Sequence, residues 1–367
     1  MADEGEPDRI EGAPHPRETA RLFGQQAAER AFLQAVGDGR LHHGWLITGP
    51  RGIGKATLAW RIARFLRAGG AEGGGLFGPP ESLDVAPDHP VSHLVAAGSD
   101  PGILPLIRTI NPDTGRLRTQ IVVDDVRRLR EFFGLSSAEG GWRVVIVDPA
   151  DEMNPNAANA LLKALEEPPK RAMLLLVSHQ PSQLLPTIRS RCRELRLAPL
   201  GAADMDRALA QALEGVHDTA TLAELSGGSV GEAIRLTSGG VALYAEIVQL
   251  LSGLPRLDRD AVLKLSNSVS AKAGDPRFDQ LVRLVDLALA RLARTGATGT
   301  TPPEAAPGES ALLARLSPDP RAARRWADLA ADLGNRARAA RAVNLDPGAL
   351  VLDMFLRLES ASRPAAG

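Results

Sequence analysis

Gly49-Pro50-Arg51-Gly52-Ile53-Gly54-Lys55 is the stretch that decides the fold of this 367-residue chain. It follows a short apolar run at 45–48, and apolar residues recur at helical spacing over 58–66 after it. A glycine-rich loop between a strand and a helix presents its backbone N–H groups to phosphate at the helix N-terminus. The stretch therefore predicts a P-loop that binds ATP or ADP, and the alternative is a tight turn beside a solvated lysine. The predicted nucleotide-binding residues are Gly49, Pro50, Arg51, Gly52, Ile53, Gly54, Lys55, Ala56, Thr57 and Asp148.

Ala56 follows the P-loop lysine, at the position where the motif carries a Ser or Thr hydroxyl for Mg²⁺. A methyl group cannot ligate a hard cation that requires oxygen. Thr57 comes one residue later, and a step of about 100° around the helix turns its hydroxyl away from the phosphates. We therefore expect weakened Mg²⁺ binding and no metal site formed by the protein.

A second buried apolar run, 144–147, ends in Asp148 and Pro149. P-loop ATPases use an acidic residue near this point to orient the attacking water, and proline carries no carboxylate. Asp148 is predicted to reach the nucleotide site. Residues 151–152 offer a shifted acidic pair, but we favour their interpretation as a turn and helix start. ATP hydrolysis by this chain is expected to be absent or very weak.

Strands alternating with helices predict an α/β domain with a mostly parallel sheet. Helices are expected over 18–36 and 121–133, strands over 143–148 and 172–178, an insertion at 69–107 and a break at 295–310. The predicted organisation is a disordered leader (1–16), a P-loop domain (17–199), a small helical unit (200–241), an all-helical domain (242–361) and a disordered tail (362–367).

Composition excludes several function classes. Apolar residues make up 44% and charged residues 24%, which is ordinary for a globular protein. The net charge of -1 provides no global field for collecting phosphates, so DNA contact should be local or secondary. One cysteine, Cys192, excludes an intrachain disulfide and every multi-cysteine zinc site. Because no apolar run has the length of a membrane span or a signal segment, we expect a cytoplasmic location.

Two segments closely resemble the hallmark segments of bacterial clamp-loader subunits, a branch of the AAA+ proteins. They are Asn-Ala-Leu-Leu-Lys-Ala-Leu-Glu-Glu-Pro-Pro at 159–169 and Ser190-Arg191-Cys192. Leu-Phe-Gly-Gln at 22–25 and Leu-Ser-Gly-Gly-Ser at 225–229 extend the resemblance over roughly 16–236. It implies an AAA+ P-loop domain with a parallel sheet, a small helical lid domain and an all-α C-terminal collar domain.

Two branches of that family share the pattern, the gamma/tau motor and the non-motor delta prime subunit. Ala56, Pro149 and the lack of a cysteine-rich zinc module favour the delta prime branch. The resemblance implies gamma/tau and delta clamp-loader subunits as partners, with the sliding clamp and primed DNA reached through the complex. The alternatives are an active motor of gamma/tau type and a AAA+ adaptor of another lineage.

Arg191 has a role that only the resemblance implies. In the family, the arginine of the Ser-Arg-Cys motif is an arginine finger that reaches the nucleotide of a neighbouring subunit. The alternative is a structural arginine in a basic stretch. The family's sensor arginine of the lid would fall at Gly231, and Arg235, four residues later, is interpreted as a solvated side chain.

Overall fold

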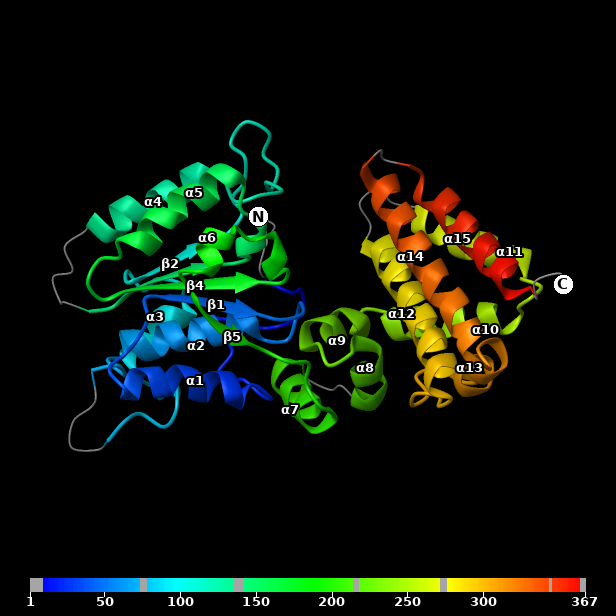
Figure 1. The fold of residues 1–367 in the computed structure, drawn as a ribbon, viewed down its shortest axis with the longest axis horizontal. Helices are drawn as coiled ribbons and strands as arrows, with labels where there is room; N and C mark the ends of the chain where they lie inside the picture. The colour runs from blue at the N-terminus through cyan, green and yellow to red at the C-terminus, as the bar shows by residue number, and fades with distance from the viewer. Residues whose placement is uncertain are drawn as a thin grey trace. The chain divides into compact units, whose positions relative to one another are not determined.

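The computed structural model describes residues 9–72, 78–134, 141–213, 218–270, 276–342 and 345–363. They form two compact units (Figure 1). The first consists of Met1–Thr219 with Ser226–Arg235, and the second of Ala220–Leu225 with Leu236–Gly367. The division therefore runs through the residues predicted to form a lid.

The first unit is built on a five-stranded sheet whose neighbouring strands are all parallel, in the order β2-β3-β4-β1-β5. The strands are β1 (Gly44–Thr48), β2 (Ile103–Leu106), β3 (Arg143–Val147), β4 (Ala172–Ser178) and β5 (Arg193–Arg196). Every residue of β1 and β4 is buried, as continuous apolar runs covered on both faces require. The predicted parallel sheet is confirmed, whereas β2 lies within the expected insertion and β5 was not predicted.

Helices cover both faces of this sheet, with α4 and α5 on one side and α1 and α2 on the other in Figure 1. The helices up to residue 237 are α1 (Gln26–Gly37), α2 (Lys55–Arg67), α3 (Pro90–Ala96), α4 (Val123–Gly134), α5 (Pro155–Glu166), α6 (Pro186–Arg189), α7 (Ala202–Ala212), α8 (Thr219–Ser226) and α9 (Val230–Thr237), with short 3₁₀ turns at Ala150–Glu152 (η1) and Pro181–Gln183 (η2). Residues 220–225 of α8 belong to the second unit. Asn154 caps α5 by accepting a hydrogen bond from the Ala157 N–H.

Two helix predictions need correction. The helix expected over 18–36 begins only at Gln26, because Gly24 has φ of +73° and the buried Gln25 side chain instead bonds two distant backbone segments. The helix expected over 121–133 begins at Val123, since Ile121 forms an isolated parallel bridge with Met153.

Residues 9–16, predicted as part of a disordered leader, contact α2 through His15. His15 is 1% exposed and its ring lies edge-on to Trp60 at 6.0 Å. Directly after it, Arg64 donates to the Arg17 carbonyl and Arg61 to the Ala20 carbonyl, each at 2.6 Å. The remainder of the predicted leader, 1–8, lies outside the described residues, as does 364–367 of the predicted tail.

The second unit is helical, as predicted for the C-terminal region. Its helices are α10 (Gly240–Ser252), α11 (Arg259–Ser270), α12 (Pro276–Thr298), α13 (Glu309–Leu316), α14 (Pro320–Ala342) and α15 (Pro347–Ser362). Within the described part of the chain, no helix is long and apolar enough to cross a membrane.

A buried ion pair organises the loop between α12 and α13, where a break was expected. Arg291 contacts both Glu309 carboxylate oxygens, at 2.7 and 3.1 Å. The same carboxylate accepts hydrogen bonds from the Tyr244 hydroxyl at 2.5 Å and the Ala305 N–H at 2.7 Å. Glu224 of α8 approaches Arg291 at 3.5 Å. A segment without apolar periodicity is therefore ordered by polar contacts.

Replacing Glu309 with Ala should destabilise the second unit by about 3 kcal/mol, because it leaves the Arg291 charge buried and unpaired. Urea unfolding followed by circular dichroism measures the loss. The matched control is Arg336→Ala, which removes an exposed pair with Asp353 and should cost at most about 1 kcal/mol. Equal losses in the two variants would contradict a structural role for the buried pair.

Candidate functional site

The candidate site lies where the parallel strands end. Thr48, the last residue of β1, is in register with Ser178 at the end of β4, and Val147 of β3 is in register with Leu176. The P-loop follows β1 directly and leads into α2. Ligands of open parallel sheets bind at this carboxyl edge.

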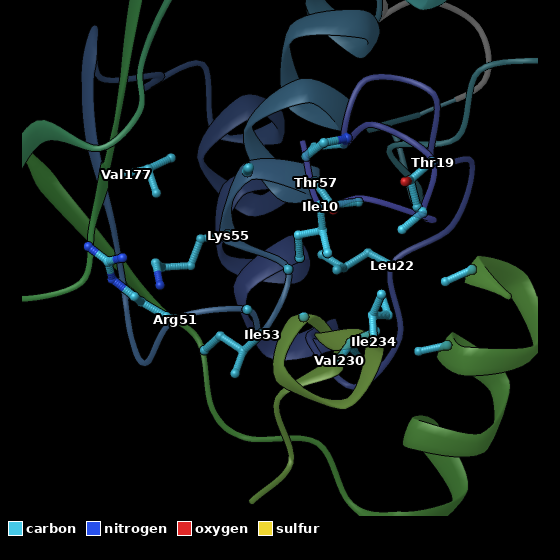
Figure 2. A pocket seen from close by; sticks show the side chains of 18 of the residues that line it. Ile10, Thr19, Leu22, Arg51, Ile53, Lys55, Thr57, Val177, Val230 and Ile234 are labelled. Atoms are coloured by element: carbon cyan, nitrogen blue, oxygen red, sulfur yellow. The ribbon is translucent and has the colours of Figure 1, made fainter. Parts of the chain in front are cut away.

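A cavity of about 260 Å³ opens at this edge (Figure 2). Its walls come from the P-loop and α2, from the ends of β3 and β4, from the ordered N-terminal residues and from α9. The lining residues include Arg51, Gly52, Ile53, Gly54, Lys55, Ala56, Thr57, Asp148 and Pro149. The structure thus brings together most of the predicted nucleotide-binding residues, and Gly49 and Pro50 are the first two residues of the same loop.

The P-loop backbone requires glycine at its two ends. Gly49 has φ of +135°, and a Cβ there would lie 2.7 Å from the Leu197 carbonyl oxygen. Gly54 has φ of +96°, and a Cβ there would lie 2.5 Å from Leu22 Cδ1. Side chains are therefore excluded from both positions, and the loop keeps the shape of a phosphate cradle.

Lys55 is 3% exposed and lies at the first position of α2. Its Nζ donates to the Gly49 carbonyl at 2.7 Å and to the Pro50 carbonyl. Burial lowers the Lys55 pKa to about 8, although the nearby Asp148 and Asp151 carboxylates act to raise it. A phosphate group would supply a strong opposite charge to this buried ammonium.

Two positions that bind Mg²⁺ and orient water in active P-loop ATPases carry other residues in this chain. Ala56 and Pro149 both line the cavity and bring no hydroxyl or carboxylate to it. No cluster of three or more His, Cys, Asp or Glu side chains among the described residues is arranged to hold a metal ion. The cradle is therefore suited to binding phosphate more than to activating water.

Asp151 and Glu152 are occupied by structural contacts, which argues against a shifted catalytic pair. The Asp151 carboxylate accepts hydrogen bonds from Ser178 Oγ at 2.5 Å, from the Gln180 N–H at 3.1 Å and from the His179 N–H. Glu152 pairs with Arg51 at 3.2 Å and with Arg108 at 2.9 Å. Asp151 thereby ties η1 to the end of β4.

Sequence reasoning missed His179, which follows β4 and lines the cavity. Burial, together with the positive charges of Lys55 and Arg51, lowers its pKa to about 3 against the opposing effect of Asp151. The imidazole is therefore neutral at physiological pH. The sequence feature that could have identified His179 is its position directly after the apolar run 172–178, a predicted buried strand.

Arg191 lies outside the cavity formed by the described residues. It follows α6, and its guanidinium contacts Glu166 at 3.0 Å and the Thr187 carbonyl at 3.0 Å. Its side chain is 37% exposed. Cys192 beside it is packed against the core, and burial raises its thiol pKa to about 12. The structure therefore separates Arg191 from the chain's own P-loop, and the contact with Glu166 was not predicted.

Comparison with known proteins agrees with this architecture. Residues 24–201 match the family model described as DNA polymerase III, delta subunit. Over 232 residues the chain is 38% identical to the DNA polymerase III subunit delta prime of Pseudomonas aeruginosa, covering 62% of this chain and 66% of the relative. Identity to the Bacillus subtilis delta prime subunit is 31% over 220 residues, covering 58% and 59%. The Mycobacterium tuberculosis gamma/tau subunit is 32% identical over 187 residues, covering 50% and 29%.

The parallel sheet, the P-loop at the end of β1 and the helices that follow define an α/β P-loop domain. The matched region of the chain spans just under two thirds of the length of the two delta prime relatives. Over the matched segments the chain is similar to DNA polymerase III delta prime subunits.

Lys55→Met should stabilise the protein near neutral pH, by about 2 kcal/mol, because the folded chain holds this lysine with its pKa lowered to about 8. The unfolded chain binds the proton more tightly, so wild-type stability rises between about pH 8 and 10.4 and the difference between the proteins shrinks there. Urea unfolding from pH 7 to 10.5 measures this trend, with the exposed Lys170→Met as control. A difference that stays constant with pH would contradict the lowered pKa.

Proposed function

We propose that this chain is a non-motor (stator) subunit of the DNA polymerase III clamp-loader complex, which helps to load the sliding clamp onto primed DNA. In that complex Arg191 acts as an arginine finger at the ATP site of a neighbouring gamma/tau subunit. The observation that carries the proposal is the position of Arg191, which is partly exposed and remote from the chain's own cavity. A partly exposed arginine that does not line its own chain's cavity is compatible with contact to a phosphate that another chain holds, and this supports the proposal.

The chemistry suits a guanidinium. Charge develops on the transferred phosphoryl group, and a planar, permanently charged arginine that stabilises it accelerates the reaction by about 10³ to 10⁵. The pair with Glu166 is half exposed, and such pairs contribute at most about 1 kcal/mol. The contact therefore orients Arg191 without competing strongly against a multiply charged phosphate.

The chain's own cavity is proposed to hold ADP or ATP through the backbone N–H groups of the P-loop and through Lys55. Asp148, at the end of β3, completes the polar side of the cavity. Because Ala56 and Pro149 replace the hydroxyl and carboxylate of active ATPases, hydrolysis is absent or very weak. The partners proposed are gamma/tau and delta subunits, with the clamp and DNA contacted through the complex.

A second candidate function is an active motor of gamma/tau type, which the 32% identity to the Mycobacterium tuberculosis gamma/tau subunit favours. The two functions differ in which site hydrolyses ATP. Turnover by the purified chain that is lost in Lys55→Ala would support the motor and contradict the stator.

Arg191→Ala should lower the DNA-stimulated ATPase rate of the complex reconstituted with gamma/tau and delta subunits by at least about 100-fold. The cause is loss of a transition-state charge partner, so assembly, measured by size-exclusion chromatography, should be unchanged. Arg189→Ala, at an exposed position on α6, is the matched control and should leave the rate within about twofold.

Full activity in the Arg191→Ala complex would rule out the finger. A wild-type chain that neither joins the complex nor stimulates its ATPase would rule out the stator role itself.

A further inference from the structure

The start of α9 lies directly against the P-loop, within the first unit. The Gly231 N–H donates to the Gly52 carbonyl at 2.9 Å, and Ser229 Oγ donates to the Arg51 carbonyl at 2.9 Å. Two neighbouring P-loop carbonyls are thus bonded to one turn of the lid helix.

Ser229 forms hydrogen bonds with both α9 and the P-loop. Its hydroxyl oxygen accepts a hydrogen bond from the Glu232 N–H at 3.1 Å, which caps α9. Its O–H group donates to the Arg51 backbone carbonyl. The residue is 8% exposed. The group that begins the helix therefore also attaches it to the loop.

The contact is so close that neither backbone can carry a side chain. A Cβ on Gly231 would lie 2.9 Å from Gly52 Cα and 3.0 Å from Ile10 Cδ1. A Cβ on Gly52 would lie 2.4 Å from Ser229 Oγ. Gly231 stands where the clamp-loader resemblance predicts a sensor arginine, and here it allows the lid backbone to touch the P-loop.

A second attachment point lies just before Ser229. Gly228 has φ of +81°, its carbonyl accepts a hydrogen bond from the Leu200 N–H at 2.9 Å, and a Cβ there would lie 2.7 Å from the Leu200 carbonyl oxygen. Residues 227–231 are therefore held both by the chain that leaves β5 and by the P-loop.

We infer that Ser229 and Gly231 latch α9 onto the P-loop through contacts that need no nucleotide. The lid helix is then a fixed wall of the cavity and does not close on a terminal phosphate. Val230 and Ile234 line the cavity with apolar surface, and Arg235 of the same helix also lines it (Figure 2). Because the helix is fixed, ADP and ATP meet the same wall. The inference rests on the proposed nucleotide site for the choice of these two probes.

Amide hydrogen exchange of the full chain, resolved across residues 227–236, tests the latch. The Gly231 amide is expected to exchange slowly without nucleotide and to change by less than about twofold with ADP or ATP. Gly231→Ala should accelerate this exchange by about five- to tenfold, because its Cβ breaks the bond to Gly52. Ser229→Ala removes one hydrogen bond without adding atoms and should accelerate it about fivefold.

Gly201→Ala is the matched control, since Gly201 has φ of -73° and no atom lies within 4 Å of the added Cβ. The latch would be overturned by Gly231 exchange as fast as in an unfolded peptide, by slowing of more than about twofold with ADP or ATP, or by wild-type exchange in both Ser229→Ala and Gly231→Ala. Arg191→Ala should not alter this exchange. Failure of the latch is therefore distinguishable from failure of the proposed function, which the ATPase of the complex reports.

Discussion

The conformation of the P-loop depends on backbone contacts from three distant parts of the chain. The buried Gln25 amide donates to the carbonyls of Ile53 and Ala198, at 3.3 and 2.7 Å, and accepts from the Ala198 N–H. Leu197 packs against Gly49, and the start of α9 bonds the middle of the loop. The loop is thus ordered largely by polar contacts with its surroundings.

These contacts fix the conformation of the P-loop independently of the side chains at positions 56 and 149. The glycines and their neighbours preserve a cradle for phosphate, and Lys55 keeps a positive charge in it at neutral pH. The side chains at 56 and 149 can change without disturbing that shape, because no contact of the network passes through them. A chain can in this way lack the groups that activate water and still fold the P-loop.

Local patterns in the sequence predicted the P-loop, the strands β1, β3 and β4, and α5, because each is a continuous apolar run or a helical repeat. They did not predict β5, an edge strand in which only Leu195 is buried, or β2, whose Pro-containing run stands in an expected insertion. The contacts of Asp151 and Glu166 were missed for another reason. Their partners are 25 to 29 residues away, and no local pattern records such pairing.

The division of the chain into two units has a topological consequence. The backbone passes between the units three times within a short stretch, after Thr219, after Leu225 and after Arg235. Neither unit is therefore a continuous segment, and no single cut releases both intact. A fragment ending at Arg235 would carry α8 without the helical unit in which its buried Leu222 and Leu225 belong, and would expose that apolar surface to aggregation.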